Sequence, residues 1–252
     1  MDTAVALVGA YLRFNGYISL PEQPILVGEG RPWRYYTATD LDLLAVRLPN
    51  AAVVVPRDDG AGGEDDQDLR IDPDPVLDLH DGTVDVLVAE VKEGRPRLND
   101  ALRSPRVLEA ALRRLDAGFD ESFDRIVGRL IRDGETTCTA GGYRWRFRLV
   151  AFGDGEAVTE GGPFRAISLR HAARFLIRCM AEHRRVWRDA QFGDTVLDLL
   201  HLLDKIGLGE AWMVSQDRRR ASARRRIEAG PPPVAVPVGQ VGLAPVRREA
   251  HT

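Results

Sequence analysis

The sequence predicts an α/β fold, because helix and strand patterns alternate along its first 152 residues. Residues 3–15 place apolar side chains at helical spacing, and Gly16 follows as a stop signal. The apolar runs 41–48 and 84–91 have the length and composition of buried strands. Another helix pattern and another strand pattern follow them. With one additional helix set aside, the predicted order of elements is αβββαβ.

Each predicted strand of the first half has its own end signals. A short strand covers Pro24–Val27, and a long strand rich in aromatic and aliphatic residues covers Arg34–Leu48, where Pro49 ends it. Residues 56–82 are rich in Asp, Gly and Pro, so we expect an acidic, flexible insertion there. The third strand covers Val84–Lys92.

Two helices, a turn and a strand follow the third strand. Ser104 and Pro105 have the residue types of an N-cap and a first helical turn, and Asp120 is the predicted cap of the second helix. Aromatic residues and arginines alternate in the strand. The predicted ranges are a helix over 104–115, a helix over 120–132, a turn over 136–142 and a strand over 143–152.

The remaining residues are predicted to be helical and then irregular. Ser168 caps a helix to about residue 190, and Asp194 caps a helix to about residue 206. A third helix pattern covers 210–228, and the proline-rich residues after it are typical of a flexible segment. The sequence therefore divides into an α/β core over 1–152, a helical extension over 153–228 and a flexible tail over 229–252.

The composition is that of a globular protein without a membrane span. No apolar run approaches the roughly 20 residues that cross a bilayer. The first residues carry no signal-peptide pattern, and Cys138 and Cys179 show no metal-type spacing, so we expect a cytoplasmic protein. Residues 57–81 carry a charge of −8, which leaves +5 for the other residues because the whole chain carries −3. That mildly basic remainder is compatible with nucleic acid.

Charged residues interrupt the two apolar strands and are candidates for a site. Asp42 lies in the first run, and Glu90 and Lys92 end the second. Such groups are costly inside an apolar sheet unless they are paired or bound to a metal. Residues two apart share a face of a strand, so Glu90 and Lys92 point the same way, as do Asp40 and Asp42. If the strands are neighbours, these groups converge, and carboxylates are the ligands that Mg²⁺ prefers.

The element order and these motifs resemble the PD-(D/E)XK, or restriction-endonuclease-like, superfamily of nucleases. The resemblance rests on Asp42-Leu-Leu-Ala, on Glu90-Val-Lys92 and on residues 10–18, which are similar to the first helix and strand of small bacterial endonuclease-like proteins and Holliday-junction resolvases. It covers about residues 3–152 and implies a central mixed sheet. Many members carry a glutamate in the first helix that completes the metal site, and here that helix has no acidic residue.

The resemblance implies a role for each of these residues. Asp42, Glu90 and the backbone carbonyl of Val91 would bind Mg²⁺, for which Mn²⁺ can substitute. Lys92 would position and activate the attacking water, and Asp40 would be an accessory carboxylate. The predicted activity is metal-dependent hydrolysis of phosphodiester bonds by a nuclease, with DNA as the expected substrate.

Two groups of arginines are candidate contacts for nucleic acid. Arg144, Arg146 and Arg148 alternate with apolar residues and give their strand one cationic face. Arg103 and Arg106 lie beside or on the helix that follows the lysine motif. The alternative interpretation of both groups is solvated surface charge. A run of six arginines over residues 218–226 either adds salt-dependent affinity or ends a soluble helix.

Two other functions stay open at the level of the sequence. The first is a catalytically inactive nucleic-acid-binding module that retains the nuclease fold. The second is an interaction protein whose helical part binds a partner protein or a second copy in a homodimer. DNA binding that survives removal of Asp42 is expected of the binding module. A stable complex without nucleic-acid affinity is expected of the interaction protein.

Overall fold

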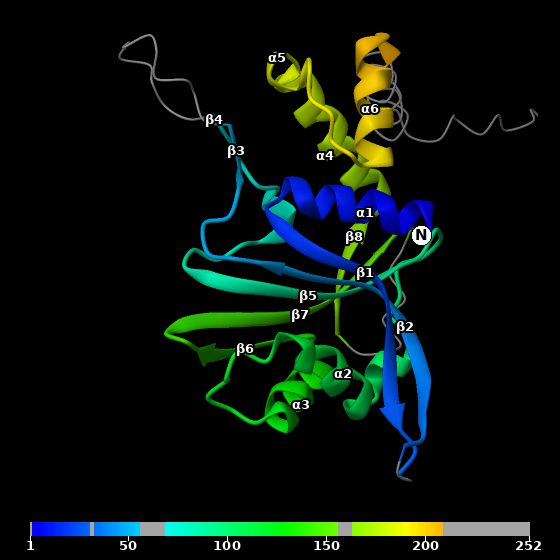
Figure 1. The fold of residues 1–252 in the computed structure, drawn as a ribbon, viewed down its shortest axis with the longest axis vertical. Coiled ribbons are helices and arrows are strands. Elements are labelled where there is room, and N and C mark those ends of the chain that lie inside the picture. The colour runs from blue at the N-terminus through cyan, green and yellow to red at the C-terminus, as the bar shows by residue number, and fades with distance from the viewer. Residues whose placement is uncertain (1, 31–32, 56–68, 156–162, 209–252) are drawn as a thin grey trace, which may run out of the picture. The chain divides into compact units, whose positions relative to one another are not determined.

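The structure is a computed structural model that describes residues 2–30, 33–55, 69–155 and 163–208. Within the unit Met1–Glu210, helices cover a curled mixed sheet (Figure 1), which confirms the predicted α/β class. No helix in the described ranges is long and apolar enough to cross a membrane. The elements are α1 (Thr3–Phe14), β1 (Tyr17–Gly28), β2 (Tyr35–Arg47), β3 (Val53–Val55), β4 (Leu69–Ile71), η2 (Pro75–Leu77), β5 (Thr83–Val91), η3 (Asp100–Arg103), α2 (Pro105–Leu112), η4 (Arg113–Leu115), α3 (Phe123–Asp133), β6 (Glu135–Ala140), β7 (Tyr143–Gly153), β8 (Arg165–Ser168), α4 (Leu169–Glu182), α5 (Arg184–Trp187) and α6 (Thr195–Lys205).

The strands of the large sheet lie in the order β1-β2-β5-β7-β6, and β8 also pairs with β7. β2 is antiparallel to β1 and β5, whereas β5, β7 and β8 are mutually parallel. Val91 pairs with Phe152, and Gly153 pairs with Ser168. The carboxyl ends of the three parallel strands therefore meet at one edge of the sheet, where α4 begins.

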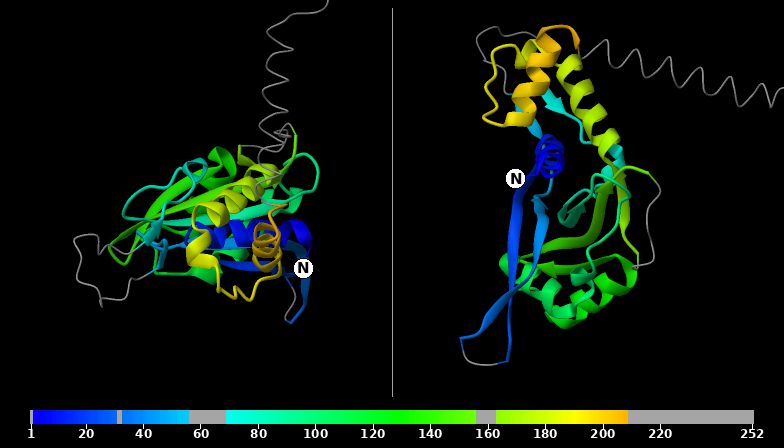
Figure 2. Two further views of the ribbon diagram at one scale, coloured as in Figure 1. Left: turned by 90° about the horizontal axis from the view of Figure 1, so that it is seen from above. Right: turned by 90° about the vertical axis from the view of Figure 1, so that its right-hand side faces the viewer.

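Helices lie on both faces of this sheet (Figure 2), and an apolar core lies on each face. Side chains of α1, α4 and α6 pack on the face that carries Leu87 and Ala89 of β5. Side chains of α2 and α3 pack on the face that carries Val86 and Val88. Since alternate residues of a strand face opposite ways, Glu90 lies on the α2–α3 face and Asp85 on the α1 face.

The first two strands form a hairpin that extends beyond the sheet. β2 pairs with β5 only from Leu43 to Arg47, while its pairing with β1 continues to Tyr35. β1 begins at Tyr17 and is therefore longer than the predicted strand 24–27. The prolines that suggested a short strand are tolerated because β1 lies at the edge of the sheet and one side of its backbone needs no partner.

Three further predictions differ from the structure. Residues 135–140 form β6 instead of the predicted turn, and inward Thr136, Cys138 and Ala140 alternate with exposed residues. The N-cap of α3 is Ser122 and not Asp120, whose carboxylate instead accepts a hydrogen bond from the Thr139 amide. Part of the predicted flexible insertion is ordered, since residues 69–82 include β4 and η2.

The predicted caps of the last two helices are confirmed. Ser168 accepts a hydrogen bond from the His171 amide at the start of α4, and Asp194 accepts two at the start of α6. α4 ends at Glu182, before α5, so the predicted single helix to residue 190 is divided. The third helical pattern, the arginine run and the tail lie outside the described residues.

Candidate active site

Asp42, Glu90 and Lys92 converge at the carboxyl edge of the parallel strands. The ammonium Nζ of Lys92 donates to Glu90 Oε2 at 2.8 Å and to Asp42 Oδ2 at 3.3 Å. The same Asp42 oxygen accepts the backbone amide of Val91 at 2.8 Å. Two carboxylates from neighbouring strands therefore share one ammonium group.

The end of the β2–β5 ladder places Asp42 at this position. The last paired residues are Leu43 and Ala89, so Asp42 lies just past the ladder, beside the end of β5. Its carboxylate satisfies the Val91 amide there, in the place of a backbone partner. Glu90 lies on the α2 face because it alternates with Val86 and Val88 of the core there, and Asp42 and Lys92 bond to each other and converge with Glu90.

Glu90 is the buried member of the cluster. Its side chain is fully enclosed, and Oε1 has no hydrogen-bond partner. Burial raises the pKa of the Glu90 carboxyl to about 7, helped by the charge of Asp42 and opposed by Lys92. Burial also pushes the pKa of Lys92 down, but the hydrogen bonds and charges of Glu90 and Asp42 outweigh this and raise it. The lysine is therefore a cation at neutral pH.

The other side of the cluster is open to solvent. The side chains of Lys92 and Asp42 are 32 % and 22 % exposed, whereas that of Glu90 is 1 % exposed. A ligand can therefore approach the ammonium and the Asp42 carboxylate without opening the core.

The donor set fits a divalent cation that prefers oxygen. Glu90 Oε1 is a buried carboxyl oxygen without a hydrogen-bond partner, and Asp42 supplies a second carboxyl group close by. No group of three His, Cys, Asp or Glu side chains suited to a metal exists in the described ranges. Two carboxylates are enough for Mg²⁺, which keeps several waters and is often completed by substrate phosphate oxygens. At Val91 the structure shows the amide contact, and metal binding by its carbonyl stays a prediction.

Asp40 does not join this cluster. It lies opposite Pro24 on the part of the hairpin that extends past β5, and its side chain is exposed. Asp40 shares a face with Asp42, but β5 does not pair with β2 beyond Leu43, so Asp40 has only β1 beside it. The structure therefore gives the predicted accessory carboxylate no contact with Glu90 or Lys92.

The arginines of β7 lie on the opposite face of the sheet from the cluster, which corrects the predicted cationic stripe. Arg148 is buried under α1, where it donates to Asp85 Oδ2 at 2.5 Å and to the Leu77 carbonyl. Arg146 is also buried and bonds to Glu135 at 2.6 Å. Only Arg144 is exposed, and it pairs with Thr83 at the far end of β5.

The arginines near α2 remain accessible on the same face as the cluster. Arg103 is 42 % exposed and forms an ion pair with Asp100 at 3.3 Å. Arg106 lies exposed in the first turn of α2, beside Pro105. Both stay candidates for a contact with nucleic acid.

Two features were missed at the level of the sequence. Asp85 is the buried ion-pair partner of Arg148. Gly153 packs against the loop that follows Lys92, because an added Cβ would lie 2.5 Å from the Gly94 carbonyl oxygen. The amide of Asp154 donates to that same carbonyl at 2.6 Å. A glycine directly after an apolar strand was the only signal of this close approach.

No protein-family model, curated protein or solved structure matches this chain. The geometry and chemistry of Asp42, Glu90 and Lys92 therefore carry the functional assignment.

Proposed function

We propose that this protein is a metal-dependent nuclease that hydrolyses phosphodiester bonds, with DNA as its expected substrate. The observation that carries the proposal is the cluster of two carboxylates around one ammonium group, in which one buried carboxylate oxygen has no partner. When both carboxylates are ionised, they carry one negative charge more than the ammonium of Lys92 balances. The open side of the cluster gives a substrate phosphate access.

The order of elements supports the restriction-endonuclease-like interpretation. α1, β1, β2, β5, α2 and β7 follow one another as αβββαβ, and α2 lies in the connection between the parallel strands β5 and β7. The small β3–β4 sheet, α3, β6 and β8 are additions to this order. The motif residues fall on β2 and at the end of β5, as the resemblance implies.

In this proposal, Asp42 and Glu90 would hold the metal ion, and Lys92 would contact the phosphate. A bound Mg²⁺ supplies a Lewis acid that stabilises charge on the phosphate and lowers the pKa of a nucleophilic water. Lys92 stays protonated because Glu90 and Asp42 raise its pKa, so it acts as a hydrogen-bond donor to a phosphate oxygen and orients the water. Asp42 keeps its hydrogen bond to the Val91 amide, which fixes its carboxylate.

A cleavage assay tests this function. Labelled duplex, single-stranded and branched DNA and labelled RNA are incubated with Mg²⁺ or Mn²⁺ and with wild type, Asp42→Asn, Lys92→Met or the matched control Asp40→Asn. We expect both cluster variants to lose about 10²- to 10⁴-fold in rate. The control removes a carboxylate two residues from Asp42 and should cleave like wild type. Circular dichroism verifies that each variant is folded.

Cleavage that persists unchanged in Asp42→Asn and Lys92→Met contradicts the proposed site. Absence of cleavage by wild type on every substrate contradicts the nuclease itself.

The inactive binding module is the second candidate, and one observation favours it. Only two carboxylates meet at the site, and no third His, Cys, Asp or Glu completes a metal-binding group in the part of the chain that the structure describes. This candidate predicts a DNA complex in a gel-shift assay that Asp42→Asn leaves intact, without cleavage by wild type.

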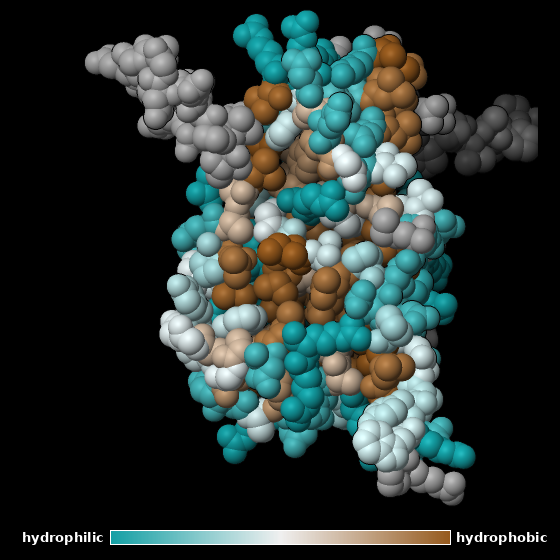
Figure 3. Space-filling model, in the orientation of Figure 1, coloured by the Kyte–Doolittle hydropathy of each residue, from teal (hydrophilic) through white to brown (hydrophobic). Residues whose placement is uncertain are grey.

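An apolar stripe on α6 favours the interaction protein. Leu199, Leu202 and Ile206 are each more than half exposed and follow helical spacing (Figure 3). If this stripe forms a homodimer, light scattering should give twice the monomer mass for wild type and the monomer mass for Leu202→Lys.

A further inference from the structure

A second pocket, of about 460 Å³, lies between α5 and α6. It is far richer in positive charge than the cluster at Asp42. Four of its side chains are cationic and one is anionic. The lining residues are Arg184, Arg185, Arg188, His201, Asp204, Lys205 and Gly207.

One arginine of this pocket is held in place by a buried carboxylate. Arg184 donates from Nε and Nη2 to the two oxygens of Asp204, at 2.8 and 2.7 Å. The Asp204 side chain is only 5 % exposed, and its hydrogen bonds from Arg184 lower the pKa of its carboxyl. His201 packs beside it, edge-on to Phe192. The floor of the pocket is therefore ordered, and its single negative charge is already neutralised.

Among the described residues, the other three cations of the pocket have no partner of opposite charge. Arg185, Arg188 and Lys205 are exposed, and they make no hydrogen bond or ion pair within the described part of the chain. Lys205 stands in the last turn of α6, where the helix dipole favours a cation. That effect does not account for the two arginines, whose charges repel each other and Lys205 unless an anion lies among them.

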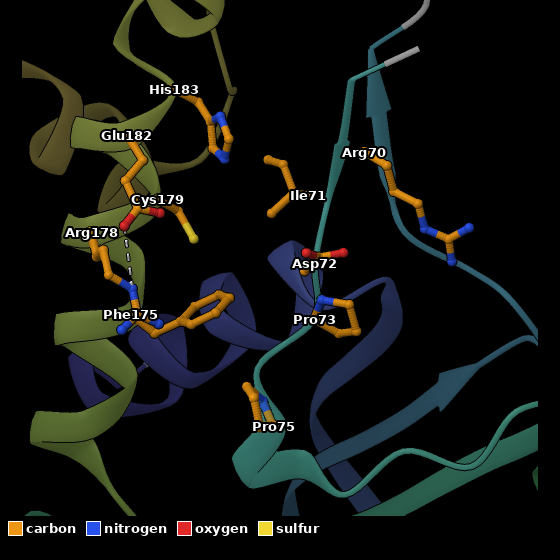
Figure 4. Close-up of a pocket in the computed structure, with 10 residues that line it drawn as sticks. All are labelled: Arg70, Ile71, Asp72, Pro73, Pro75, Phe175, Arg178, Cys179, Glu182 and His183. Atoms are coloured by element: carbon orange, nitrogen blue, oxygen red, sulfur yellow. Dashed lines mark ion pairs between the residues drawn. The ribbon is translucent and has the colours of Figure 1, made fainter. Parts of the chain in front are cut away.

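Another pocket, drawn in Figure 4, lacks this excess of positive charge. It lies between β4 and α4, has a volume of about 440 Å³, and two arginines in its lining are matched by Asp72 and Glu182. Arg178 and Glu182 form an ion pair at 3.9 Å, and burial raises the pKa of the Cys179 thiol to about 12. The α5–α6 pocket therefore differs from the β4–α4 pocket in its unbalanced positive lining.

We propose that the α5–α6 pocket binds phosphate groups. Arginine presents paired N–H donors that match phosphate oxygens, and its charge persists at any physiological pH. The volume falls in the range of small-molecule sites and exceeds the needs of one inorganic ion. The phosphates come either from a nucleic-acid backbone or from a free nucleotide. This site is separate from the proposed nuclease centre, and its existence does not depend on cleavage.

Binding measurements on the full chain test this inference without any cleavage, since EDTA is present throughout. The probes are fluorescently labelled duplex DNA, followed by anisotropy, and inorganic pyrophosphate, followed by calorimetry. The test variant is Arg185→Ala/Arg188→Ala. Its matched control, Arg125→Ala/Arg132→Ala, removes the same charge from exposed positions of α3. A third variant, Arg185→Lys/Arg188→Lys, keeps the charge.

We expect the test variant to lose at least tenfold in affinity for the probe that wild type binds. If that probe is duplex DNA, the slope of log K against log salt should become shallower by about 1.8, which corresponds to two phosphate contacts. The lysine variant should retain most of the salt slope, and the α3 control should behave like wild type.

The two probes separate the sources of phosphate. Tight binding of the duplex with weak pyrophosphate binding assigns the pocket to a nucleic-acid backbone, and the reverse assigns it to a free nucleotide. Wild-type affinity of the test variant for both probes overturns the inference, as does an equal loss in the α3 control, which would mean diffuse attraction by net charge. The test variant keeps Asp42, Glu90 and Lys92, and binding is measured in EDTA without cleavage, so failure of the nuclease proposal is distinguishable from failure of this one.

Discussion

Two charged clusters lie on opposite faces of the same sheet, and they differ in charge balance and in access to solvent. Asp42 and Glu90 share the ammonium of Lys92 on the α2 face. Asp85 bonds to Arg148 on the α1 face, with the hydroxyl of Tyr17 donating to the same carboxylate oxygen. Both clusters are built from adjacent strands by carboxylates and cations, so residue type alone does not separate them.

Charge balance and exposure distinguish the cluster of Glu90 from a structural ion pair. The cluster of Asp85 has one carboxylate for one guanidinium, and both side chains are at most 3 % exposed. The cluster of Glu90 has two carboxylates for one ammonium, and the Lys92 side chain is 32 % exposed. A neutral, enclosed pair fixes packing, whereas an open cluster short of one positive charge can accept a cation.

The largest expected difference between the clusters is in stability. Arg148→Met leaves the Asp85 carboxylate buried without a cation, and we expect a loss of about 3–5 kcal/mol in the free energy of unfolding. Lys92→Met should cost less, on the order of 1 kcal/mol, because Glu90 can take up a proton and Asp42 has access to water. Urea unfolding at neutral pH measures both.

The double variant Asp85→Leu/Arg148→Met is the control for this prediction. Since it removes both charges, it should recover much of the stability that Arg148→Met loses. Equal losses from Arg148→Met and Lys92→Met would remove the distinction between a structural pair and an open cluster.

The second prediction concerns the pH dependence of stability. The Glu90 carboxyl has a pKa of about 7 in the folded protein, against 4.5 for an unperturbed glutamate. A raised carboxyl pKa means that the folded state binds more protons, so Glu90 favours unfolding increasingly as the pH rises from about 4.5 through 7. Glu90→Gln should therefore gain stability relative to wild type across this window, by on the order of 3 kcal/mol.

Unfolding curves recorded at several pH values for wild type and Glu90→Gln test this sign. Asp40→Asn is the matched control and should run parallel to wild type at each pH. A difference between wild type and Glu90→Gln that stays constant with pH is incompatible with a raised pKa at Glu90.

Alternation along the strands predicted that Asp42, Glu90 and Lys92 converge, but it did not predict the burial of the β7 arginines. The pattern shows which residues share a face, and this was enough to bring Glu90 and Lys92 toward Asp42. It does not show which face a helix covers, so Arg146 and Arg148 read as a surface stripe although they are buried. Their partners, such as Glu135, come from other elements and leave no local signal.

The sequence also did not show where the pairing between two strands stops. Asp40 and Asp42 are equivalent by alternation, and only the register of β2 on β5 separates them, since pairing stops at Leu43. The same limit applies to β6, whose alternation was masked by the turn-forming Gly141 and Gly142 beside it. Pairing between strands that are distant in the sequence decides both the position of Asp40 and the formation of β6. Such pairing depends on contacts that a short stretch of sequence does not contain.

The third prediction concerns Mg²⁺ binding by the cluster of Asp42, Glu90 and Lys92. Mg²⁺ should stabilise the folded protein through the open cluster, by about 1.4 kcal/mol at ten times its dissociation constant. Asp42→Asn and Glu90→Gln should abolish this gain, because each removes a carboxylate ligand. Thermal unfolding with increasing Mg²⁺ measures the effect, and Asp133→Asn, an exposed carboxylate on α3, is the control. An equal gain in the cluster variants would place Mg²⁺ elsewhere.

The smallest expected effect tests where the open cluster ends. Asp40→Ala removes an exposed carboxylate that contacts neither Glu90 nor Lys92, so stability should stay within about 0.5 kcal/mol of wild type. Mg²⁺-induced stabilisation should also be unchanged, because the end of the β2–β5 ladder separates Asp40 from the cluster. Thermal unfolding with and without Mg²⁺ is the measurement. A loss of the Mg²⁺ effect in Asp40→Ala would mean that the hairpin bends to bring this carboxylate to the metal, and the cluster would then hold three acids rather than two.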